Sequence, residues 1–600
     1  MDAAMALERM MRTNTQVVPV LKAKQKEVSL VNILNRLFEL FEELGNDAVA
    51  ATLGTLIGEF GADIAPYARE LTSRMVTKFL TLFRAEAEDD EQALTAAECL
   101  QALNAIFIAV RQIPQAFPAL EPIVQPLLTE LLTENGIEFM EDVCELLATL
   151  TYHAKPQISD LTWSYFPKLI EACNGWGLDY VGTMLPVFDN YIHKGNARFV
   201  SNKQPNYVEL LLTVVNKFFF GKTKMVVDDY DHADDEKELD PDQKPKRKRE
   251  FIEAPHPEID QMIASRILEM IVCHSRYKID QYVPGILKVV VEKLISVKSD
   301  EFKYILCDIL ATCVYYNPAL FYRTCQQLDS QPMQNGKAFS ANAFNQWLSL
   351  LPHMKRKRRE KLACVGLSAL CLVPLSSAPQ TITKDFFAEM LVELLAVMRS
   401  RLTAIEEKRK KMAVHEERKK RKEAREKRRE EAAARGEDVP DEDEKGEGDE
   451  DVELVDSDAE HEGEEESDEE LLLPSQVKNF NDVDADKDTF VAKEDGDEAE
   501  QSLDSFAAQV HNSLWTGGIH DAQADFWSPM EELDQFICFS DALQNLSSTQ
   551  REFYALWTKA LNAERVQALD GVLKEASSRK QQAAEAEAAK AAKAANNPNK

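Results

Sequence analysis

Apolar residues at helical spacing recur along most of this sequence, and this repetition limits its fold more than any other feature. Between Leu30 and Leu44 they fall at steps of three and four residues, which places them on one face of a helix. Gly45 follows where a helix-ending glycine is expected. Further helices are predicted at 49–60, 66–80, 93–112, 117–132, 137–152, 159–173, 178–193, 205–219, 257–275, 279–297, 300–316, 338–350, 361–372 and 384–402.

Two such helices with their turns take about 40 residues, which is the period of HEAT repeats. The chain has 600 residues, too many for one compact core, so several domains or a repeat array are expected. Strand-type alternation is rare, which argues against sheet folds. We therefore predict an all-α fold, a HEAT-repeat solenoid (superhelix) with a long disordered acidic insert.

Composition divides the chain around this array. Residues 404–434 are rich in Glu, Lys, Arg and Ala, as in a solvated helix held by ion pairs between successive turns. We predict HEAT-type repeats over 1–225 and 255–403, a charged flexible loop over 226–254, a charged segment able to form a helix over 404–435, an acidic disordered insert over 436–510, a C-terminal helical segment packing on the solenoid over 511–575, and a disordered tail over 576–600.

The charge of the chain is concentrated in the acidic insert. The formal net charge is −33, and between Gly436 and Glu470 the only Lys or Arg is Lys445. This balance argues against direct nucleic-acid binding, which needs a basic face, and fits the attraction of basic proteins. A solubilising spacer is the alternative. The residues expected to attract basic cargo are Asp441, Glu442, Asp443, Glu444, Glu464, Glu465 and Glu466.

Two shorter signals lie in the charged segments. Ser457 and Ser467 each precede acidic residues, so an acid-directed kinase is expected to phosphorylate them, which mass spectrometry of the cellular protein would test. The cluster Lys246, Arg247, Lys248 and Arg249 matches a short nuclear-localisation pattern. Such clusters also arise by chance in charged loops.

The search for chemistry predicts no catalytic, metal or cofactor site. Gly221-Lys222-Thr223 resembles part of a P-loop, but Asn216 stands where the first glycine of that motif belongs. His153 and His274 lie near helix ends without a partner at metal-ligand spacing. The ten cysteines are scattered through apolar helices, as buried reduced thiols are. No signal-peptide core and no membrane span are expected, and the chain is predicted not to be an enzyme.

The order of several short phrases resembles a known family. Val314–Leu320, Phe344–Leu348 and Lys361–Leu367 are followed by the acidic insert and by Tyr554–Trp557. In that order they look like the C-terminal half of the importin-beta superfamily (karyopherins), in its importin seven and eight branch, which includes Nmd-five-like and Sxm-one-like members. The likeness covers most of residues 15–575.

The resemblance implies a nuclear import receptor that shuttles between cytoplasm and nucleus through the pores of the nuclear envelope. Its implied partners are basic cargo such as ribosomal proteins and histones, and phenylalanine-glycine nucleoporins. The N-terminal half of the family, with its main Ran-GTP contacts, has no counterpart here, so Ran-GTP is implied for full-length members. The alternative is a HEAT-repeat scaffold or chaperone for ribosomal proteins or histones without transport activity.

Overall fold

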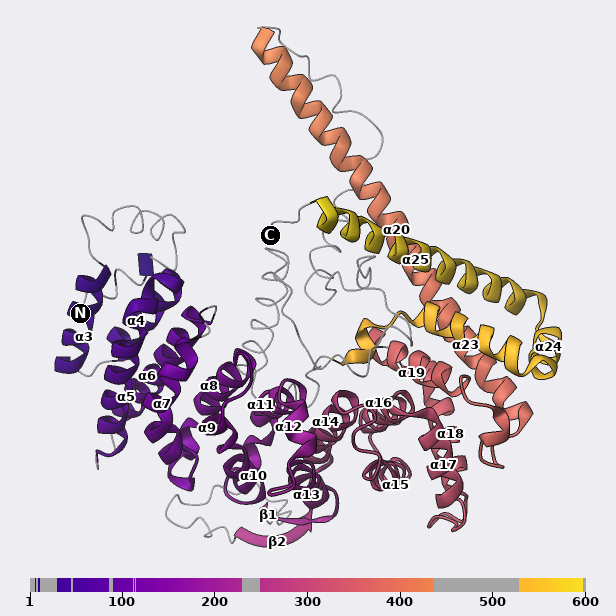
Figure 1. Cartoon of the computed structure of the whole chain (residues 1–600), viewed down its shortest axis with the longest axis horizontal. Coiled ribbons are helices and arrows are strands. Elements are labelled where there is room, and N and C mark those ends of the chain that lie inside the picture. Colours follow the sequence, from indigo (N-terminus) through magenta and orange to yellow (C-terminus); the bar gives the residue numbers. More distant parts are fainter. Residues whose placement is uncertain are drawn as a thin grey trace, which may run out of the picture. The chain divides into compact units, whose positions relative to one another are not determined.

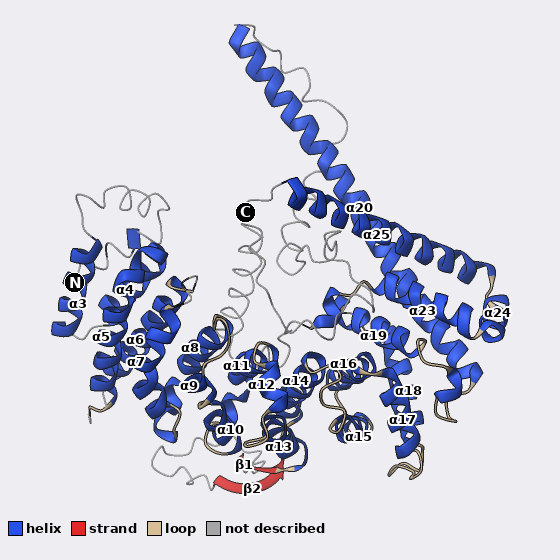
Figure 2. Ribbon diagram, viewed as in Figure 1, coloured by secondary structure: helices blue, strands red, loops and turns tan. Residues whose placement is uncertain are grey.

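The computed structural model describes the chain over seven main ranges. They are 30–44, 47–85, 90–111, 115–228, 249–354, 356–435 and 528–596, with residues 6, 9, 10 and 113 in addition. Within these ranges the chain is helical apart from one pair of strands (Figure 2). The predicted all-α solenoid is thereby confirmed for the described residues, and the acidic insert over 436–510 lies outside them.

The helices follow one another closely, as Figure 1 shows. Their bounds are α3 Leu30–Leu44, α4 Asp47–Phe60, α5 Ala68–Phe83, α6 Asp90–Ala109, α7 Ala116–Leu131, α8 Met140–Tyr152, α9 Asp160–Trp163, α10 Phe166–Asn174, α11 Val181–His193, α12 Asn196–Ser201, α13 Tyr207–Phe220, α14 Glu258–His274, α15 Val283–Leu294, α16 Asp300–Tyr316, α17 Pro318–Leu328, α18 Phe339–Leu350, α19 Lys357–Leu370, α20 Lys384–Arg435, α23 Gln535–Thr549, α24 Arg551–Ala560 and α25 Ala563–Asn596.

The helices group into two compact units. The first takes the described residues up to Ile286 and Val297–Ile309, and the second takes Leu287–Ser296, the described residues from Leu310 to Arg435 and those from Pro529 onward.

Helices of the first unit pack in two rows, as in HEAT repeats. In one row α6 lies against α4 and α8, and α11 lies against α8 and α14. In the other, α5 packs on α7 and α10 packs on α13. Leu53, Leu103, Leu147 and Phe188, one from each of four successive helices of the first row, are fully buried. The apolar stripes of the sequence therefore meet in a continuous core.

Local signals explain where several helices begin. The Ser159 hydroxyl accepts a hydrogen bond of 3.0 Å from the backbone N–H of Thr162 and caps α9. Asn317 accepts one of 3.0 Å from the N–H of Leu320 and caps α17, whose first residue is Pro318. An Asn cap followed by proline is a strong helix start. The helix α17 was not among the predicted helices, although this signal announces it.

Two paired strands correct the two ends of the flexible loop predicted over 226–254. Strand β1, Lys222–Asp228, pairs antiparallel with β2, Arg249–Pro255, so that Lys222 lies opposite Pro255 and Asp228 opposite Arg249 (Figure 2). Met225 and Val226 of β1 lie opposite Ile252 and Phe251 of β2 in the register. β-Branched and aromatic residues favour strands. Residues 229–248 lie outside the described part of the chain.

The second unit is built around the 52-residue helix α20. Its first half is buried through Phe387, Leu391, Leu394 and Met398, and Ile405 is also buried. The charged segment 404–435 continues the same helix. Helix α25 packs along α20 and against α23, while α23 packs on α19.

Helix α25 corrects the prediction of a disordered tail over 576–600. It runs to Asn596, and Ala576 is fully buried on it. Alanine, glutamate and lysine are strong helix formers, and the Gln581 side chain donates a hydrogen bond of 2.9 Å to Glu585 one turn on. A segment without an apolar stripe can thus extend a helix that is anchored upstream.

By length and composition alone, the stretch Gln92–Ala109 of α6 could cross a membrane. Helices α16 and α17 pass the same test only together, and they are bent by 116° at the break between them. Half of the α6 stretch is buried, against α4, α5 and α8 among others, which is how a core helix passes such a test. The expectation that the chain does not span a membrane stays a prediction.

Candidate functional site

Most predicted site residues lie outside the described part of the chain. This holds for the acidic residues between Asp441 and Glu466, for Ser457 and Ser467, and for Lys246, Arg247 and Lys248. Arg249 is described as the first residue of β2, opposite Asp228. The roles assigned to these residues stay predictions.

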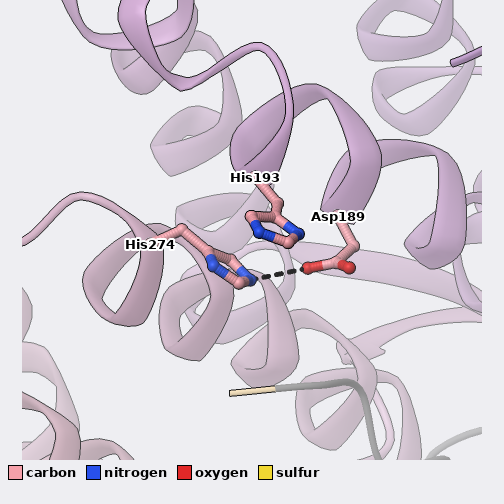
Figure 3. Close-up of side chains that lie close together, drawn as sticks. All are labelled: Asp189, His193 and His274. Carbon is pink, nitrogen blue, oxygen red and sulfur yellow. Dashed lines mark hydrogen bonds and ion pairs between the residues drawn. The ribbon is translucent and has the colours of Figure 1, made fainter. Parts of the chain in front are cut away.

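The structure instead gathers three ligand-type side chains between two helices of the first unit. Asp189 and His193 lie one turn apart on α11, and His274 ends α14 (Figure 3). The Nε2 atom of His274 lies 3.0 Å from Oδ1 of Asp189. The two imidazole rings are stacked with their centroids 4.5 Å apart and an angle of 13° between their planes. One ligand atom from each residue falls within 4.8 Å of the others.

A polar network fixes the end of α14 beside α11. Asn196, at the start of α12, donates from Nδ2 to the backbone oxygen of His274 at 2.8 Å and to Oγ of Ser275 at 3.2 Å. Its Oδ1 accepts a hydrogen bond of 3.1 Å from Nζ of Lys278. Asn196 therefore ties the C-terminal end of α14 to the start of α12. Only 2% of the His274 side chain is exposed.

Burial is the main cause of the pKa shifts of His193 and of its neighbour Lys194. It lowers the pKa of His193 to about 4, assisted by His274 and Lys194 and opposed by Asp189. At neutral pH this imidazole is therefore uncharged. Burial also lowers the pKa of Lys194 to about 8. The Lys194 ammonium donates a hydrogen bond to the backbone oxygen of Tyr152. It also lies 3.4 Å from the centroid of the Tyr152 ring.

No pattern of ligand residues at short spacing in the sequence points to the full cluster. Asp189 and His274 are 85 positions apart. The one local signal is the spacing of four between Asp189 and His193 on a helix, which puts both side chains on one face.

A second polar cluster, the C-terminal ion network, fastens the end of the chain in the second unit. Arg579 of α25 contacts Asp534 at 2.6 Å (Nη1 to Oδ2) and Glu575 at 2.8 Å (Nε to Oε1). Arg409 of α20 contacts Glu575 at 2.7 Å. Burial acts to raise the pKa of Glu575, but the hydrogen bonds from Arg409 and Arg579 outweigh it and hold that pKa below its usual value. The network therefore joins α20, α25 and the start of α23.

No family model matches the chain. Over 386 residues the chain is 24% identical to "Importin beta-like SAD2 homolog" of Arabidopsis thaliana. This match covers 62% of the chain and 33% of that relative. It is 24% identical over 389 residues to "Probable importin-7 homolog" of Dictyostelium discoideum, and this match covers 64% of the chain and 32% of that relative. It is 23% identical over 374 residues to "Importin-8" of Mus musculus, and this match covers 62% of the chain and 32% of that relative. The matched region spans about a third of the length of each relative.

Proposed function

We propose that this chain, whose curated homologues are importin-beta-like proteins of the importin-7 and importin-8 branch, forms a cargo-binding portion of a nuclear import receptor. The observation that carries the proposal is the likeness to those relatives, which covers 62% of the chain for the Arabidopsis relative. The helical repeats of the described residues support it. In this role the chain shuttles between cytoplasm and nucleus and supports Ran-dependent import.

Its cargo is proposed to be basic protein, such as ribosomal proteins or histones. The net charge of −33 favours positively charged partners. Acidic residues of the insert, such as Asp441–Glu444 and Glu464–Glu466, add an attraction that acts before contact and raises the rate of encounter. Helical repeat arrays offer extended surfaces on which such partners bind.

Deleting residues 436–470 is expected to weaken cargo capture at low salt and to leave capture at high salt nearly unchanged. Screening already suppresses the long-range attraction when the Debye length is short. The measurement is the association rate with purified core histones and with basic ribosomal proteins over a salt series. A deletion of matched length at the C-terminal end of the insert, 471–505, serves as control. Capture that ignores both salt and the 436–470 deletion would contradict a role for the acidic insert.

Binding to phenylalanine-glycine repeats separates a transport receptor from a scaffold. A receptor portion is expected to bind an immobilised repeat peptide more strongly than a control peptide with each phenylalanine changed to serine. Its cargo is expected to be released by Ran-GTP and not by Ran-GDP when the chain is supplied within a receptor that carries the N-terminal half of the family. Stable residence on one ribosome-assembly or histone complex without repeat binding would favour the scaffold.

A further inference from the structure

Asp189, His193 and His274 form a donor set that the transport function does not use. The set consists of two imidazoles and one carboxylate, which are ligands that Zn²⁺ accepts. They come from two helices packed against each other, α11 and α14, and only 10% of the Asp189 side chain is exposed. We propose that these three residues bind a zinc ion that joins the ends of α11 and α14.

The distances suit one small ion. Ligand atoms about 2.0–2.1 Å from a tetrahedral zinc lie about 3.3 Å from one another. Oδ1 of Asp189 and Nε2 of His274 are 3.0 Å apart, and the three ligand atoms lie within 4.8 Å of one another. A separation of 4.8 Å has to shorten by about 1.5 Å when the ion binds, which requires the stacked imidazoles to turn. A water molecule completes the fourth position, as in zinc sites with three protein ligands.

The position of the histidines in their helices favours a cation independently of the side chains. His193 is the last residue of α11, and His274 is the last residue of α14. The C-terminal end of a helix carries a partial negative charge, so two such ends meet at this cluster. Figure 3 shows both rings beside the Asp189 carboxylate.

Each of the two neighbouring lysines donates a hydrogen bond to another residue. Lys194 donates to the backbone oxygen of Tyr152 and lies over that ring. Lys278 donates to Oδ1 of Asn196 at 3.1 Å. The Oδ1 atom of Asp189 lies 3.0 Å from Nε2 of His274.

The test uses the full chain without a histidine tag, titrated with Co²⁺ as a spectroscopic substitute for Zn²⁺. We expect one Co²⁺ per chain, a visible d–d absorption of tetrahedral type, and no thiolate-to-metal charge-transfer band. The absence of a charge-transfer band distinguishes binding at this site from binding by any of the ten cysteines of the chain. Zn²⁺ is expected to displace the Co²⁺ and to raise the thermal unfolding midpoint, because a ligand that binds the folded state stabilises it.

Asp189→Asn and His193→Gln are expected to abolish the absorption band. Each substitution should weaken Co²⁺ binding by more than roughly 10–100-fold, which is the loss of metal affinity when a residue that only supports a ligand is replaced. His153→Gln is the matched control, since His153 is a half-buried histidine of the same unit whose ring packs edge-to-face on Tyr152 instead. Circular dichroism of the metal-free proteins verifies folding. The proposal is overturned if the wild type binds no stoichiometric Co²⁺, if both variants bind as tightly as the wild type, or if His153→Gln loses binding as well.

Discussion

Replacing Asp534 by alanine is expected to lower the free energy of unfolding of the second unit by about 3–5 kcal/mol, the cost of removing one partner from a buried ion pair. Only 1% of the Asp534 side chain is exposed, and it lies 2.6 Å from the Arg579 guanidinium, itself 11% exposed. Its Oδ1 also accepts hydrogen bonds from the backbone N–H groups of Phe536 and Ile537 at 2.9 and 3.0 Å. The substitution therefore removes a helix cap and one of the two carboxylates that neutralise the buried Arg579 guanidinium, the other being Glu575.

Hydrogen exchange is the measurement for this prediction. We expect protection to fall first in α23 and in the part of α25 around Arg579, because these segments are joined through Asp534. Glu564→Gln is the control on α25, the helix that carries Arg579. The ion pair of Glu564 with Arg399 is exposed on both sides, so the unfolding midpoint should stay unchanged. An Asp534→Ala protein with wild-type exchange in α23 and α25 would refute the anchoring role of the C-terminal ion network.

The helices of this chain were largely predictable because their signal is local. The segment predicted at 205–219 forms α13, Tyr207–Phe220, and that at 257–275 forms α14, Glu258–His274. Each carries its apolar stripe within one window of sequence, and burial of that stripe against the next helix follows from its pattern. The repeat arrangement then follows because neighbouring pairs must cover each other's apolar faces.

The features that were missed depend on contacts between distant residues. Strands β1 and β2 are short and separated by charged sequence, and Lys222 finds its partner only at Pro255. The length of α25 depends on anchoring through Arg579 to Asp534, 45 positions earlier. The Asp189–His274 contact spans 85 positions. None of these pairings leaves a periodic trace, so a search by spacing passes over them.

Removing the carboxylate of Glu269 is expected to cost the first unit about 3–5 kcal/mol of unfolding free energy. Glu269 and Arg266 stand one turn apart on α14, with Nη1 and Oε2 2.7 Å apart and side chains exposed by only 0% and 1%. Helix α14 is buried on nearly every side between Gln261 and Cys273. A charge at the centre of α14 is therefore desolvated. When the Glu269 carboxylate is removed, water cannot solvate the Arg266 guanidinium in its place.

The comparison that separates charge from packing is a double-mutant cycle read by chemical unfolding. Glu269→Leu combined with Arg266→Met should recover most of the loss seen in Glu269→Leu alone, because an apolar pair of similar volume is often as stable as a buried ion pair. Lys303→Met, which breaks the more exposed pair with Asp300 at the same spacing on α16, should cost at most about 1 kcal/mol. If the double variant is as unstable as Glu269→Leu, packing and not the unpaired charge sets the stability of α14.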